Sequence, residues 1–190
     1  MTAKVVGART GMLSPSLIVD RAGLQLVRRL NVPSGTTSIT ETDLVTTGYH
    51  RFHVKIRGLS IATSQVVTFA IAGHSGTYSC AGGIGASSGA LFTPNFSGAS
   101  SIGVSNNSLS SGNFGSLDID FALGSGITQA NQQLIHSEWY TNAYFVVLQC
   151  RMDGGAFPAT HNGLTIGFSG TTVSPASNCA VLYELYRYET

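Results

Sequence analysis

The strict alternation of apolar and polar residues in several short runs constrains the fold of this chain more than any other feature. In residues 51–57 (RFHVKIR), Phe52, Val54 and Ile56 occupy every second position. Successive side chains of a strand point to opposite faces of a sheet, so such a run predicts a strand with one buried face. Further runs of this kind cover residues 65–72 (QVVTFAIA), 117–123 (LDIDFAL) and 164–168 (LTIGF).

The other long apolar runs also favour strands. Residues 144–152 (YFVVLQCRM) begin apolar on both faces, which predicts a central strand, and residues 179–188 (CAVLYELYRY) form a tyrosine-rich run. Glycine, serine and asparagine clusters separate the runs, as in turns and loops. The one candidate helix, residues 127–137, lacks a strong apolar stripe. The chain is therefore predicted to be all-β, an antiparallel, jelly-roll-like β-sandwich with long Gly/Ser-rich loops.

Two segments differ from this pattern. Residues 1–31 are predicted to be a short N-terminal arm, and residues 32–190 a single β-sandwich domain. Within the arm, residues 17–30 (LIVDRAGLQLVRRL) are apolar and basic, which favours an arm or a first strand that docks onto a partner. Residues 73–116 are rich in glycine and serine but carry recurring apolar residues. We expect long packed loops there, with one or two short strands, at one end of the sandwich.

Charge is scarce in this chain. Charged residues make up 10% of it, against about 25% in an average soluble domain. We infer that neighbouring subunits cover much of the surface, or that neutral Ser, Thr and Asn side chains line it. The net charge is +1 without a basic tail, so we expect no nucleic-acid partner. With no run of 18 apolar residues and no signal-peptide pattern, we expect synthesis in a cytoplasm and no membrane span.

The three cysteines, Cys80, Cys150 and Cys179, are odd in number and widely spaced. Without a CxxC pair, a zinc ribbon is excluded. Cys150 and Cys179 lie in apolar runs, where cysteine behaves as a small hydrophobe. We therefore expect buried free thiols, with a single disulfide as the alternative.

The order of motifs along the chain resembles small head domains of tailed-phage tail proteins. The motifs are VPSGTTSITETDL (32–44), YHRFHVKIRGLSIAT (49–63), VVTFAIAGHSGTY (66–78), GSLDIDFAL (115–123) and LTIGFSGTTVSPASNCAVLYELYRY (164–188). The resemblance covers residues 32–188. It implies a β-sandwich, commonly trimeric, on a fibre, tail tip or capsid surface, where it binds host surface structures or cements capsid subunits. Residues 1–31 are too short for a fibre shaft, which favours a capsid decoration protein or a tail-tip component that docks through the arm.

Motifs for catalysis or metal binding are weak. Residues 85–89 match G-x-S-x-G, but they lie in a Gly/Ser-rich stretch without the helix that a nucleophile elbow requires. Asp118 and Asp120 are about 7 Å apart by strand rise, within the range of glycosidase carboxylates, but nothing else indicates a cleft. A calcium site using this pair is a minor alternative. His50 and His53 cannot share a strand face, which argues against a metal site formed by the pair. From these weak motifs together we expect no catalytic residue, metal site or cofactor.

A basic stripe is the most informative polar feature. Its four residues, Arg51, His53, Lys55 and Arg57, share one face of the strand predicted at 51–57. Three interpretations are open for this stripe. It is a solvated face, or it contacts another subunit through a stripe such as Asp118 and Asp120 or through a neighbouring capsid protein. The third interpretation is a contact with anionic host polysaccharide.

Two further groups complete the predicted contact residues. Arg28 and Arg29 lie in the segment predicted to dock onto a partner. Trp139 and Tyr140 follow Glu138 and could hold a glycan, although an anchor in the core or an interface is the plainer interpretation of Trp139.

These features together predict a non-enzymatic, homotrimeric structural protein on the exterior of a tailed-phage particle. Its tasks are virion assembly contacts and attachment to host surface glycans, with other phage structural proteins as partners. A capsid decoration (cement) protein that stabilises the head is the alternative. A carbohydrate-binding module or a polysaccharide depolymerase ranks below both.

Overall fold

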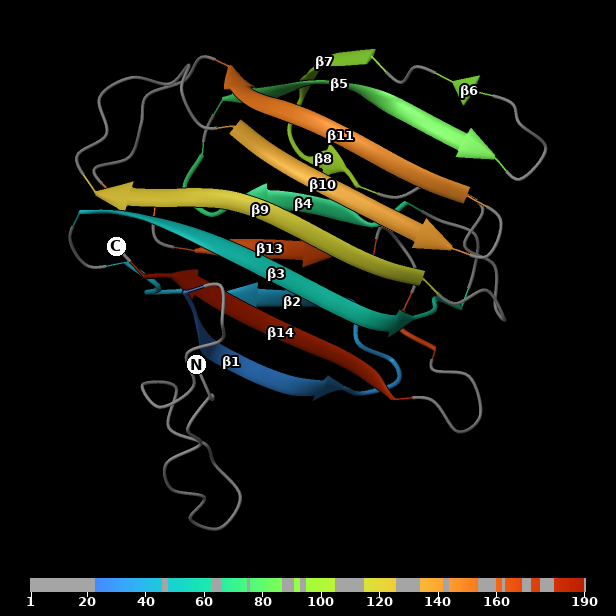
Figure 1. The fold of residues 1–190 in the computed structure, drawn as a ribbon, viewed down its shortest axis with the longest axis horizontal. Helices are drawn as coiled ribbons and strands as arrows, with labels where there is room; N and C mark the ends of the chain where they lie inside the picture. Colours follow the sequence, from blue (N-terminus) through green and yellow to red (C-terminus); the bar gives the residue numbers. More distant parts are fainter. Residues whose placement is uncertain are drawn as a thin grey trace, which may run out of the picture.

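The protein is a β-sandwich of two antiparallel sheets (Figure 1). The computed structural model describes residues 23–45, 48–62, 66–74, 76–86, 91–92, 95–104, 115–125, 134–141, 144–153, 160–161, 163–168, 172–174 and 180–189. The all-β prediction is confirmed, whereas the jelly-roll connectivity stays a prediction.

The large sheet has ten strands and forms the nearer layer in Figure 1. Its order is β1-β14-β3-β9-β10-β11-β5-β6, with β12 beside β9 and β7 beside β5. The bounds are β1 Leu24–Val32, β3 Tyr49–Leu59, β5 Thr77–Ala86, β6 Leu91–Phe92, β7 Asn95–Ala99, β9 Gly115–Ser125, β10 Leu134–Thr141, β11 Tyr144–Asp153, β12 Thr160–His161 and β14 Val181–Tyr188.

The small sheet has four short strands and lies behind the large sheet in Figure 1. Its order is β2-β13-β4-β8. The bounds are β2 Ser38–Glu41, β4 Thr68–Ile71, β8 Ile102–Gly103 and β13 Leu164–Gly167.

The core lies between the sheets and follows the predicted alternation. Phe52 in β3 and Phe121 in β9 are buried and stack with their ring centroids 5.7 Å apart. Phe69 in β4 meets Phe121 from the small sheet at 5.2 Å. Full burial of such a side chain contributes about 1.5–3 kcal/mol, so this trio helps to hold the two layers together. The predicted faces of the runs at 51–57, 65–72, 117–123 and 164–168 are confirmed.

Part of the segment predicted as an arm or first strand lies in the large sheet. Residues 24–31 lie in β1, which pairs with β14 of the same chain from Leu24↔Tyr188 to Val32↔Val181. Leu26 and Val32 are buried. These two apolar residues of β1 therefore pack within the sandwich, and β1 continues past residue 31, the predicted end of the arm. Residues 1–22 lie outside the described residues.

The glycine-rich region at 73–116 contains more strand than predicted. β5 runs for ten residues and pairs along its whole length with β11. A Cβ atom on Gly82 would lie 2.1 Å from the Val147 carbonyl oxygen, and one on Gly85 would overlap the Phe145 ring. Glycine is therefore needed here for close strand packing, whereas sequence reading takes it as a loop signal. Of the weak helix candidate at 127–137, residues 134–137 lie in β10.

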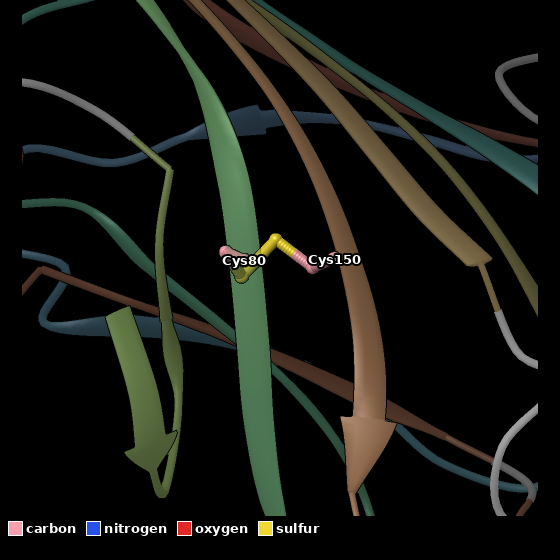
Figure 2. The surroundings of a disulfide bond; sticks show 2 residues. All are labelled: Cys80 and Cys150. Carbon is pink, nitrogen blue, oxygen red and sulfur yellow. A yellow bond between two sulfur atoms is a disulfide. The ribbon is translucent and has the colours of Figure 1, made fainter. Parts of the chain in front are cut away.

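The expectation of free thiols is wrong for two of the cysteines. Cys80 in β5 and Cys150 in β11 stand directly opposite each other and form a disulfide across 70 residues of sequence (Figure 2). Their Cα atoms are 4.1 Å apart, and both residues are buried. Sequence spacing could not reveal this pair because the register of β5 against β11 brings it together. Cys179 lies outside the described residues.

No helix with the length and apolarity needed to cross a bilayer occurs in the part of the chain that the structure describes.

Candidate functional site on the exposed face of the large sheet

Polar residues from six neighbouring strands form two rows on the face of the large sheet that points away from the small sheet. Residues directly opposite each other on paired strands point to the same face, so the strand register defines each row. The rows are Tyr186, His53, Asp120, His136 and Gln149, and Arg29, Glu184, Lys55, Asp118 and Glu138. We call these ten residues the polar face.

His53 stands at the centre of the polar face, between two carboxylates of β9. Its Nδ1 atom is 3.0 Å from Asp120 Oδ1, and its Nε2 atom is 3.1 Å from Asp118 Oδ1. Burial lowers the pKa of His53, but the hydrogen bonds and charges of Asp118 and Asp120 together outweigh it and raise the pKa to about 9. His53 is therefore an imidazolium at neutral pH and donates a hydrogen bond to each carboxylate.

Asp120 has two further neighbours. The Tyr188 hydroxyl donates a hydrogen bond of 2.7 Å to Asp120 Oδ1, and the Arg51 guanidinium lies 4.8 Å from the centre of the Tyr188 ring. Burial alone raises the pKa of Asp120, but hydrogen bonds from His53 and Tyr188, with the charges of His53 and Arg51, lower it overall. Asp120 is thus held as a carboxylate.

This arrangement limits the chemistry of the two aspartates. A general base must be unprotonated at the working pH, and His53 with a pKa of about 9 is not. A glycosidase needs one protonated carboxyl group as its acid, whereas the pKa of Asp120 is lowered. The His53–Asp118–Asp120 triad therefore suits the cross-linking of β3 to β9 better than proton transfer.

A second ion cluster forms around Glu184 of β14. Arg29 Nε donates a hydrogen bond of 2.7 Å to Glu184 Oε1, and Arg29 Nη2 also contacts this oxygen. Arg57 Nη2 lies 3.9 Å from Glu184 Oε2. The Glu184 side chain is 2% exposed, against 52% for Arg29 and 62% for Arg57. The hydrogen bond with Glu184 is the main cause that raises the pKa of Arg29.

Arg28, the neighbour of Arg29, points to the other side of β1. Its Nη1 atom lies 3.3 Å from Oε2 of Glu41, a buried residue at the end of β2 in the small sheet. Burial raises the pKa of Glu41, and the charge of Arg28 opposes that effect. Burial and the nearby Glu41 charge raise the pKa of Tyr183. Arg28 therefore links the two sheets.

The structure brings together the predicted basic and acidic stripes, but within one chain. His53 contacts both aspartates, and Lys55 Nζ lies 4.0 Å from Asp118 Oδ1. An inter-subunit contact between these stripes is one of three interpretations of the sequence, and the structure shows the stripes in contact within one chain because β3 and β9 are neighbours.

The remaining predicted residues have different outcomes. Arg28 and Arg29 are paired with Glu41 and Glu184 of their own chain but keep more than half of their side chains exposed. Trp139 and Tyr140 lie in β10, opposite Val146 and Phe145 of β11. Their side chains lie outside what the structure describes.

Sequence reasoning missed the acidic residue of β14. Glu184 is the acidic residue of a largely apolar and aromatic run, and a charge at such a position signals a buried ion pair. His136 and Glu138, 3.0 Å apart at Nε2 and Oε1, also belong to the polar face. Their i, i+2 spacing on a strand was the available signal. Within the described residues, no group of three or more His, Cys, Asp or Glu side chains is placed to hold a metal ion.

The small sheet has a very different exposed face. Its outward positions on β2, β13 and β4 carry hydroxyl groups or small side chains and no charge. They are Ser38, Thr40, Thr68, Ala70, Thr165 and Gly167. The hydroxyl oxygens of Thr40 and Thr165 lie 3.5 Å apart. We call these six residues the neutral face.

Comparisons with known proteins leave the family of this chain open. No protein-family model matches the chain, and a search of curated proteins finds no match. The solved structure of alginate lyase Aly36B has a TM-score of 0.27 and 10% identity, and the match covers 84% of this chain and 77% of that one. A structure of infectious bursal disease virus Gx strain has a TM-score of 0.12 and 13% identity, covering 96% and 43%. Likenesses this weak carry no argument about fold or function.

Proposed function

We propose that this protein is a non-enzymatic structural protein on the exterior of a tailed-phage particle. It acts through its exposed sheet faces, in contacts with other phage structural proteins and in attachment to host surface glycans. It does so as a homotrimer. The order of its sequence motifs, which resembles small phage head domains, supports this placement.

The observation that carries the non-enzymatic part of the proposal is the His53 triad. Asp118 and Asp120, the carboxylate pair that could act in glycan cleavage, both bind the same imidazolium. These hydrogen bonds join β3 to β9. Residues that hold neighbouring strands together in this way stabilise the sheet surface that makes contacts, rather than acting on a substrate.

The neutral face supports the assembly part of the proposal. Burying a charge in a contact costs several kcal/mol unless a partner group compensates it. Hydroxyl groups both donate and accept hydrogen bonds, so three copies of a Ser/Thr face that meet around a threefold axis can satisfy one another. The neutral face therefore suits packing against another copy of the chain.

Mass measurement in solution and co-sedimentation with particles test this proposal together. Light scattering of the purified chain should give a stable trimer. Added to particles that lack the protein, the chain should sediment with them in a fixed molar ratio. A monomer that stays in the supernatant contradicts the proposal.

The capsid decoration role is the alternative, and the same chain can decide it. Separated heads and tails should be incubated with the protein in parallel. Binding to tails supports the leading role. Binding to heads alone, with greater resistance of the heads to heat, supports the cement role. If the chain instead cleaves a polysaccharide, and Asp118→Asn abolishes the cleavage, both structural roles fail.

A further inference from the structure

We propose that Arg29, Arg57 and Tyr186, positioned by the buried Glu184, form a binding site for a carboxylate-bearing sugar of an acidic polysaccharide. This inference rests on the proposed attachment role and names the class of ligand. It concerns one end of the exposed face of the large sheet, where β1, β14 and β3 lie side by side (Figure 1).

One carboxylate sets the spacing of the two guanidinium groups. Glu184 lies on β14, the strand between β1 and β3. Arg29 contacts its Oε1 atom from β1, and Arg57 approaches its Oε2 atom from β3 at 3.9 Å. The two arginines are thus held on either side of a fixed anion. A ligand meets a preorganised pair rather than two freely rotating side chains.

The positively charged arginine side chains are more exposed to solvent than the carboxylate that they contact. Glu184 is 2% exposed, whereas more than half of each arginine side chain faces solvent. A guanidinium has five N–H donors, and the contact with Glu184 engages the Nε and Nη2 groups of Arg29. The planar fork of the remaining donors matches a carboxylate, which it can bind through two parallel hydrogen bonds. Lys55, opposite Glu184 on β3, adds a further cation.

Tyr186 favours a sugar over a flexible acidic side chain as the ligand of this site. It lies two residues beyond Glu184 on β14, so both side chains point to the same face. Its ring is partly exposed, next to the ring of His53 at 6.4 Å between centroids. A tyrosine offers an apolar ring face with a polar tip. A ring-shaped ligand that carries a carboxylate can contact the tyrosine and an arginine at once.

Calorimetry with the full chain and three polymers tests the ligand class at one ionic strength. Polygalacturonate supplies sugar carboxylates, dextran is a neutral sugar polymer, and polyglutamate supplies carboxylates on a peptide. We expect binding to polygalacturonate, none to dextran, and weaker binding to polyglutamate. Equal or tighter binding of polyglutamate overturns the sugar assignment in favour of an acidic peptide, and no binding to polygalacturonate overturns the site.

Matched variants locate the site on the sheet. Arg57→Gln removes one cation and leaves the Arg29–Glu184 pair intact, whereas Arg151→Gln removes an exposed cation of β11 on the same face. We expect Arg57→Gln to weaken polygalacturonate binding about tenfold, or 1.4 kcal/mol, and Arg151→Gln to change it little. Tyr186→Leu should weaken polygalacturonate binding more than polyglutamate binding. Equal losses in the two glutamine variants overturn the site, with melting curves checking that each variant folds.

The outcomes also separate this inference from the proposed function. If the chain joins particles but does not bind polygalacturonate, the sugar site is overturned and the virion role stands. If it binds polygalacturonate through Arg57 but never joins particles, the virion role fails and the sugar site stands.

Discussion

The two exposed sheet faces of this protein are built on the same alternating pattern but carry opposite chemistry. The polar face gathers cations and carboxylates of β1, β14, β3, β9 and β10, and ion pairs such as His53–Asp118 and Arg29–Glu184 join neighbouring strands. The neutral face of the small sheet carries threonine hydroxyls, such as those of Thr40 and Thr165, whose oxygens lie 3.5 Å apart. A low overall charge therefore does not mean an evenly uncharged surface: charge is concentrated where it cross-links strands.

The comparison extends to covalent bonds, because the large sheet holds the Cys80–Cys150 disulfide. Closing a loop of 70 residues lowers the conformational entropy of the unfolded chain, which stabilises the folded state by about 4 kcal/mol. We expect reduction to lower the free energy of unfolding in urea by this amount, the largest effect among these predictions. Mass spectrometry of non-reduced peptides should find residues 80 and 150 linked. A transition in urea that reduction leaves in place contradicts the assignment.

Arg29→Ala should show how strongly the polar face depends on its ion pairs. It leaves the buried Glu184 with the more distant Arg57 as a partner. Removing one member of a fully buried pair costs about 3–5 kcal/mol, and we expect about 2 kcal/mol here because Arg29 is half exposed and Arg57 remains. Thr165→Ala on the neutral face is the control and should change stability by less than about 0.5 kcal/mol. Equal effects of the two variants, measured in urea, would remove the contrast between the faces.

Stability should depend on pH through His53. Its pKa is about 9 in the folded protein, above the ordinary 6.5. The contribution of its charge to folding is therefore complete below pH 6.5 and is lost as pH rises through 9. We expect a decline of about 2 kcal/mol across this window, less than the full shift implies because water partly screens both aspartates. Urea unfolding at several pH values measures it, and in His53→Gln this decline should disappear.

Thr165→Arg gives the smallest expected effect on folding but tests the neutral face as a contact. Its position is partly exposed, so the free energy of unfolding of the isolated chain should change by less than about 0.5 kcal/mol. An uncompensated charge in a packed contact is costly, so the trimer should dissociate in light scattering. Arg57→Gln, on the other face, should leave the trimer intact. A trimer that survives Thr165→Arg places the contact elsewhere.

Local patterns predicted single strands well and their pairing poorly. The alternation in residues 51–57 and 117–123 correctly separated buried from outward-facing side chains. It could not show that these two strands are neighbours, so the sequence left open whether the stripe with His53 faces solvent, the aspartates of another subunit or a polysaccharide. Pairing depends on side-chain contacts between distant segments, which no short window of sequence contains.

The same limit explains the other missed features. The glycines of β5 are turn signals when read alone and so favour a loop, yet Gly82 and Gly85 pack closely against β11. The disulfide depends on that same pairing. Glu184 gains its role only when β1 and β3 flank β14 and bring arginines to it from both sides.

The position of β14 has a consequence for how the chain reaches its native state. β14 is the last of the described strands in chain order, yet it lies between β1 and β3, two of the first. Neither early strand can complete its hydrogen bonds until more than a hundred intervening residues have been synthesised. Sheets that depend on such distant pairings fold slowly and leave strand edges open meanwhile. A nascent chain of this protein therefore passes through a stage in which β1 and β3 are exposed to aggregation.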